Sequence, residues 1–266
     1  MKLLTVLVSC NFCLLIVFGA ICYTTCDEVS YDVGVDFVTS LTKAVDDDAA
    51  SAATTVRVGI DASGSRYRAL LAFNLESVSE QLRAKSLTGH GCARIKRASL
   101  LFYVHSKQLR ASASFDPSPN EKHADAMPTQ PTPFRLYASD VMLPWDRESV
   151  DWMYRHRSGN TSRWNVPFLK ANGLDARYPA YSFLNIALQP ERSEHSVDVT
   201  ESVQRWLADS STNHGLLLWL WQDLLFMKVQ WRKMRPSALL TIASKGSANE
   251  LERPRLRIQI EGKTQS

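Results

Sequence analysis

The stretch SVDVTESVQRWLADSSTNHGLLLWLW, residues 196–221, decides the fold of this chain. Val197 and Val199 alternate with polar residues, which predicts a short strand. Thr200 is a candidate N-cap, because its hydroxyl can accept a hydrogen bond from a backbone N–H of the following turn. Apolar residues then recur at helical spacing, so we expect one to two helical turns that close one end of a sheet. These residues are Val203, Trp206 and Leu207.

A second strand follows a polar loop that Gly215 closes. It is apolar on both faces, which is typical of a central strand that is covered on both sides. Leu216, Leu218 and Leu220 share one face, and Leu217, Trp219 and Trp221 share the other. The two tryptophans stand about 7 Å apart, a spacing close to the size of a sugar ring. They form either a carbohydrate-binding surface or a core face that the next segment, LLFMKVQW, covers.

The remaining chain predicts one all-β domain, a jelly-roll-type antiparallel β-sandwich with one short helix and long rim loops. Apolar and polar residues alternate with period two in several segments, as in a sandwich. Residues 106–133 interrupt this pattern with a Pro- and Ser-rich stretch, which predicts a long exposed loop. The alternating segments are TTVRVGI, YRALLAFNL, ARIKRASLLFYVHS, FRLYAS, SFLNIAL, PSALLTIAS and RPRLRIQIEG. We place the sandwich at residues 54–262.

The N-terminal residues 1–22 predict a secretory signal peptide, with one Lys, an apolar run and small residues near Cys22. The alternative is an uncleaved signal anchor, since the apolar run approaches the length that spans a bilayer. Residues 23–53 predict a first strand and an acidic loop. Its aspartates 46, 47 and 48 form either a solvated loop or part of a structural calcium site, the one cofactor that we consider.

A secreted, extracellular location allows a disulfide bond and N-glycosylation. Cys26 and Cys92 remain after signal cleavage and can form one disulfide in an oxidising compartment; alternatively Cys26 pairs with another chain or stays free. Asn160 begins an Asn-Thr-Ser triplet, which is an acceptor pattern for N-glycosylation.

Charge and motifs argue against several classes of protein. The net charge of +4 is spread along the chain without a block of five like charges. We therefore expect no nucleic-acid partner, and no membrane partner once the signal is removed. Zinc spacing, a nucleophile elbow and nucleotide-binding glycine patterns do not occur in the sequence. Glu148 and Asp151 are the most suggestive carboxylate pair for glycoside hydrolysis, and the competing interpretation is a structural hydrogen bond in a loop.

Several segments in order resemble the DNRLRE domain, also described as carbohydrate-binding module family 96. These are RYRALLAFNL, RIKRASLLFYV, PWDRESVDW, Arg163-Trp164, VDVTESVQRWL with HGLLL, and TIASKGSANELERPRLRIQI. The most specific parts are W-x-x-E-x-V-x-W at Trp145 to Trp152 and DVT-x-x-V-x-x-W at Asp198 to Trp206. The resemblance spans about Thr54 to Gly262, but this chain adds residues 106–133 and 223–237.

The resemblance implies a secreted, non-catalytic β-sandwich that binds polysaccharide, with basic residues for acidic polymers. We therefore expect a carbohydrate-binding module, not an enzyme, whose partner is an anionic polysaccharide. The first alternative is a structural or adhesive protein of an extracellular matrix or cell surface, and the second is a polysaccharide lyase or hydrolase. The candidate carbohydrate contacts are Trp219, Trp221, Arg57, Arg66, Arg68 and Tyr103.

Overall fold

The computed structural model describes residues 12–17, 20–43, 54–87, 94–110, 134–157, 161–165, 174–177, 182–187, 192–221 and 237–265. It confirms the predicted all-β, antiparallel sandwich of jelly-roll type: one curled sheet of 12 strands, and a separate two-stranded sheet. The strands are β1 (Phe12–Val17), β2 (Ala20–Gly34), β3 (Phe37–Lys43), β4 (Thr55–Ile60), β5 (Arg66–Ala72), β6 (Arg94–Arg110), β7 (Phe134–Asp140), β8 (Tyr154–His156), β9 (Ser162–Arg163), β10 (Ser182–Ile186), β11 (Ser193–Asp198), β12 (Leu216–Leu220), β13 (Ser237–Ala243) and β14 (Arg255–Gln265).

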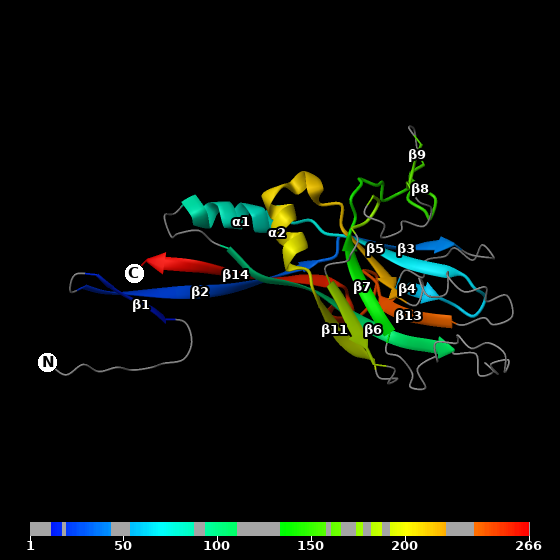
Figure 1. Cartoon of the computed structure of the whole chain (residues 1–266), viewed down its shortest axis with the longest axis horizontal. Coiled ribbons are helices and arrows are strands. Elements are labelled where there is room, and N and C mark those ends of the chain that lie inside the picture. Colours follow the sequence, from blue (N-terminus) through cyan, green and yellow to red (C-terminus); the bar gives the residue numbers. More distant parts are fainter. Residues whose placement is uncertain are drawn as a thin grey trace, which may run out of the picture.

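The strand order in the large sheet is β1-β2-β14-β6-β13-β4-β5-β12-β7-β10, with β11 on β6 and β3 on β5. β2 pairs with β14 from Thr24 to Gly34, so this N-terminal strand belongs to the same sheet as the strands after residue 54. In Figure 1, β1, β2 and β14 run out together from the main body of strands, and the helices lie to one side of them.

Curling of the sheet brings its two halves onto a common core. Leu100 of β6 and Leu256 of β14 belong to the same buried cluster as Leu136 of β7 and Leu218 of β12. A second cluster lies on the opposite face of β12, where Leu217 and Trp219 pack with residues of the segment after β7. The predicted division of this strand into two apolar faces is therefore confirmed, and of the two alternatives for its second face, the structure shows the covered one at Leu217 and Trp219.

The predicted helix is α2 (Thr200–Ala208), whose Val203 and Trp206 are buried. The predicted N-cap role of Thr200 is wrong, since no side-chain cap hydrogen bond forms. Its hydroxyl instead accepts a hydrogen bond from the backbone N–H of Ala98 on β6 (2.9 Å), and Asp198 Oδ1 accepts one from Thr200 N (2.9 Å). Thr200 thus attaches the helix to the sheet.

Two features differ from the predicted boundaries. A second α-helix, α1 (Glu76–Leu87), follows β5, so the expectation of one helix is wrong. Among the side chains of α1 that the structure describes, residues 76–84, Val78 is the buried one and Leu82 packs partly buried beside it, which gives too weak an apolar pattern to predict a helix. β6 extends to Arg110 and pairs with β13, so residues 106–110 are strand rather than loop.

Several predictions fall outside the described residues. These concern Cys92, Asn160, aspartates 46–48, the rest of the 106–133 insert and the segment LLFMKVQW. Cys26 lies on β2 opposite Lys263, and residues 12–17 pair with 20–25 as a hairpin; signal cleavage stays a prediction. Within the described ranges, no helix is long and apolar enough to cross a membrane.

Candidate functional site

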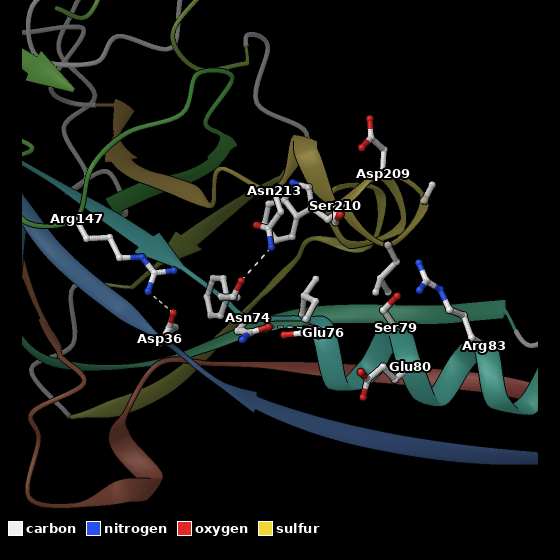
Figure 2. Close-up of a pocket in the computed structure, with 15 residues that line it drawn as sticks. Asp36, Asn74, Glu76, Ser79, Glu80, Arg83, Arg147, Asp209, Ser210 and Asn213 are labelled. Carbon is white, nitrogen blue, oxygen red and sulfur yellow. Dashed lines mark hydrogen bonds and ion pairs between the residues drawn. The ribbon is translucent and has the colours of Figure 1, made fainter. Parts of the chain in front are cut away.

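A pocket of about 630 Å³ opens between α1 and the end of α2 (Figure 2). This volume lies in the range of small-molecule sites, about 300–1,000 Å³. Apolar side chains contribute to its lining at the junction of the sheet and the helices. They are Phe73, Leu75, Trp206 and Leu207. Polar residues from four segments complete the lining: Asp36, Asn74, Glu76, Ser79, Glu80, Arg83, Arg147, Asp209, Ser210 and Asn213.

One wall of the pocket is a single face of α1. Asn74 starts this helix, because its Oδ1 accepts a hydrogen bond from Glu76 N at 2.9 Å. Glu76, Ser79, Glu80 and Arg83 follow at spacings of three, four and seven residues, which places them on one side of a helix. Figure 2 shows these side chains along the side of α1 that faces the pocket.

The opposite wall is formed by the turn after α2. Asp209 Oδ1 accepts hydrogen bonds from Ser211 Oγ (2.6 Å) and Ser211 N (3.0 Å). These bonds, the side-chain bond first, hold the pKa of Asp209 below its ordinary value, so the carboxylate is ionised at neutral pH. Asn213 Nδ2 donates to Phe73 O at 2.9 Å and so links this turn to the segment before α1.

An ion pair lies at one end of the pocket. Arg147 Nη1 contacts Asp36 Oδ2, as the dashed line in Figure 2 shows. Lys245 Nζ also donates a hydrogen bond to Asp36 O at 2.7 Å. These contacts connect the residue before β3 to two distant loops, so this end of the pocket is held by three segments of the chain.

The lining carries more negative than positive charge. The lining residues include four carboxylates, from Asp36, Glu76, Glu80 and Asp209, and two guanidinium groups, and Arg147 pairs with Asp36. The Asp209 carboxylate points away from α1 in Figure 2. Among the described residues, Arg83 forms no ion pair. A polyanion would be repelled by this arrangement, whereas a neutral ligand rich in hydroxyl groups can bond to both carboxylates and guanidinium.

Two polar atoms of the lining residues are buried and have no hydrogen-bond partner within the described part of the chain. They are Nε1 of Trp206, which is a donor, and Oδ1 of Asn213, which is an acceptor. Such groups are rare in folded proteins, and bound water or a ligand is one of the usual reasons for them.

The predicted tryptophan surface is only partly available to a ligand. Trp219 is 1% exposed, its Nε1 donates to Ser139 Oγ at 3.0 Å, and its ring stacks on Tyr137 at 4.5 Å. The prediction that Trp219 contacts carbohydrate is therefore wrong, because strands on both sides and the second cluster enclose it. Trp221 is half-buried, with its ring 6.0 Å from that of Tyr137.

The predicted basic and aromatic contacts do not gather at one place. Arg68 is buried on β5, so its assignment as a ligand contact is wrong. Arg57 is exposed on β4, with its guanidinium 5.4 Å from the Tyr67 ring, and Arg66 is half-buried at the start of β5. Tyr103 lies on β6, which β13, β4 and β5 separate from β12 in the sheet.

Of the two carboxylates considered for catalysis, that of Asp151 has a local structural role. Asp151 Oδ1 accepts hydrogen bonds from the backbone N–H groups of Met153 and Tyr154, both at 2.7 Å. Glu148 is exposed in the turn before it, with its backbone N–H bonded to Asp146 Oδ1 at 3.2 Å. In the described segments, no group of three or more His, Cys, Asp and Glu side chains is arranged to hold a metal ion.

The sequence contains a signal for one wall of the pocket, helix α1, that strand periodicity does not reveal. Asn74 followed by Glu76, Ser79, Glu80 and Arg83 is an N-cap with a polar helical face. The neighbouring segments have strand periodicity, which drew attention from the helix between them. The opposite wall of the pocket, the turn after α2, lies more than 120 residues later in the chain. Comparison with known proteins adds no relative, since neither a family model nor a curated protein matches the chain.

Proposed function

We propose that this chain is a non-catalytic carbohydrate-binding protein that binds a neutral saccharide unit in the pocket between α1 and α2. The observation that carries the proposal is the pocket itself: about 630 Å³, with carboxylate, amide, hydroxyl and guanidinium groups around an apolar base. Saccharides combine hydroxyl groups with apolar C–H faces, so they match a lining of this mixed kind. The antiparallel sandwich supports the proposal as a scaffold only, because fold alone does not establish function.

The charges of the lining favour a neutral sugar over the acidic polysaccharide expected from the sequence. Glu76 and Glu80 lie one helical turn apart on α1, and both line the pocket. Neighbouring carboxylates would repel a uronate or sulfate group in this pocket. Hydrogen bonds between sugar hydroxyls and charged side chains are each worth about 1.5–3 kcal/mol, so two or three suffice for specific binding.

Affinity electrophoresis tests the proposal with gels that contain cellulose derivatives, xylan, galactomannan, soluble chitin, alginate or pectin. The key variant is Glu80→Ala with Arg83→Ala, which removes two pocket groups from an exposed helix face and leaves the net charge unchanged. Gln81→Ala is the matched control, because it is exposed on the same helix but does not line the pocket.

We expect retardation by at least one neutral polymer, an affinity loss of about tenfold or more in the double variant, and no change for Gln81→Ala. Retardation only by alginate or pectin that disappears in salt would contradict a neutral ligand. Retardation that is equal in all variants would place the binding elsewhere. Release of new reducing ends from any polymer would contradict a non-catalytic role.

A further inference from the structure

A row of aromatic side chains crosses the outer face of the sheet at its β10 edge. Phe183 lies opposite Tyr137 in the pairing of β10 with β7, and Trp219 lies opposite Tyr137 in the pairing of β12 with β7. The ring centroids are 5.7 Å apart for the first pair and 4.5 Å for the second. Phe183 is 54% exposed, whereas Trp219 is buried, so the row runs from the interior to the surface.

The buried end of the row holds the exposed end in place. The Trp219 indole is fixed by its hydrogen bond to Ser139, and Tyr137 stacks on it with an interplanar angle of 13°. The Trp221 ring, directly after β12, has its centroid 6.0 Å from that of Tyr137. Aromatic rings packed in this way lose little conformational freedom on binding, which favours their use as a contact surface.

Polar groups border the same row. Arg135 and Asn185 are opposite each other two residues along β7 and β10, and therefore on the same face as Tyr137 and Phe183. Arg135 Nε donates to Asn185 Oδ1 at 3.3 Å, and its guanidinium lies 5.3 Å from the Phe183 ring. The surface thus joins flat rings to a guanidinium and an amide.

We infer that this aromatic face, defined by Phe183, Tyr137, Trp221, Arg135 and Asn185, is a second contact surface for a neutral polysaccharide. One pyranose ring stacks its C–H face on Phe183 and Tyr137, and its hydroxyls meet Arg135 and Asn185. The inference rests on the proposed carbohydrate-binding function and extends it from the pocket to a second surface.

The size of the aromatic face favours a sugar over a second copy of the chain. A stable dimer buries about 800 Å² on each partner, but only Phe183 in this row is more than half exposed, and a whole aromatic side chain offers about 150–250 Å². The Arg135 guanidinium, from β7, lies 5.3 Å from the Phe183 ring of the edge strand β10, and a charge beside an edge strand discourages pairing with another sheet edge.

Isothermal titration of the purified chain with cellohexaose, xylohexaose, mannohexaose and chitohexaose tests the inference. Phe183→Leu keeps an apolar side chain but removes the aromatic ring, and Phe183→Trp restores one. Leu251→Ala is the control, because Leu251 is 75% exposed on the short turn before β14 and lies outside the aromatic face.

We expect Phe183→Leu to weaken hexasaccharide binding about fivefold, Phe183→Trp to keep it, and Leu251→Ala to leave it unchanged. If only the pocket variant, Glu80→Ala with Arg83→Ala, weakens binding, the aromatic face is overturned and the proposed function stands. If only Phe183→Leu weakens binding, the face stands and the pocket is overturned. A dimer in sedimentation that Phe183→Leu dissociates would assign the face to a second copy and overturn this inference.

Discussion

Asp140, at the end of β7, pairs with two arginines from different parts of the chain. Its side chain is 1% exposed and contacts Arg205 on α2 and Arg177 after β7, the latter at 3.5 Å. The backbone N–H of Arg177 also donates to Asp140 O at 2.9 Å. Asp140 therefore joins the sheet, the helix that contributes to the pocket, and the segment that covers the second cluster.

Replacing Asp140 with Asn keeps the side-chain shape and removes its charge. Loss of one partner from a buried ion pair costs about 3–5 kcal/mol. The two arginines are each 28% exposed, and water screens part of their charge, so we expect a loss of about 2–3 kcal/mol in the free energy of unfolding. For a domain of this size that corresponds to roughly 4–12 °C in Tm.

Urea denaturation measures this difference, and Asp32→Asn supplies a control with the same chemical change. Asp32 pairs with Arg257 through two contacts of 2.9 Å, but the two side chains are 44% and 43% exposed, so we expect a loss below about 1 kcal/mol. Equal losses in the two variants would refute the reasoning that burial of the carboxylate sets the magnitude. A changed m-value would indicate a change in compactness rather than in this ion pair alone.

Three further perturbations follow from single contacts. Trp219→Phe removes the hydrogen bond to buried Ser139, so we expect a loss of about 1–3 kcal/mol in the free energy of unfolding in urea denaturation; an unchanged free energy of unfolding would contradict this. Gly215 and Gly64 both have positive φ, +84° and +91°, but an added Cβ would lie 2.1 Å from a carbonyl oxygen of β5 at Gly215 and in open space at Gly64. We therefore expect Gly64→Ala to lower the free energy of unfolding by about 1–2 kcal/mol and Gly215→Ala to lower it by more. Burial, and then the charge of a nearby arginine, lower the pKa of His214 in the folded state below its value in the unfolded chain. The contribution of His214 to the free energy of unfolding is therefore complete above the unfolded pKa and is lost as the pH falls through the folded pKa. His214→Gln should therefore reduce the loss of stability between pH 7 and pH 5 in thermal melts, and an unchanged pH slope would contradict this.

Strong period-two alternation was sufficient to predict most of the sheet. Val56, Val58 and Ile60 of β4, and Leu216 and Leu218 of β12, are all buried where the pattern places them. These positions were predictable because alternation assigns faces without knowledge of the partner strand. Helix α1 was not predictable in this way, since Val78 is the one buried residue among its described side chains and gives no periodic signal.

The pocket could not be predicted because its walls come from distant parts of the sequence. Asn213 reaches the carbonyl of Phe73, the residue before Asn74, only after β12 has paired beside β5. The same limit explains the error at Trp219. Sequence places it on a face with Trp221, but only the packing of the segment after β7 decides that one indole is sealed and the other is half-buried.

By itself the sequence determined the antiparallel sheet, the helix after β11 and the two faces of β12, because these depend on residue periodicity along short stretches. Tertiary structure alone decided which polar residues share a pocket, that Arg68 and Trp219 are buried, and that Phe183 continues the row of Tyr137 at the surface. Those outcomes depend on strand order and on long-range contacts, and the local alternation of apolar and polar residues is the same for many such arrangements.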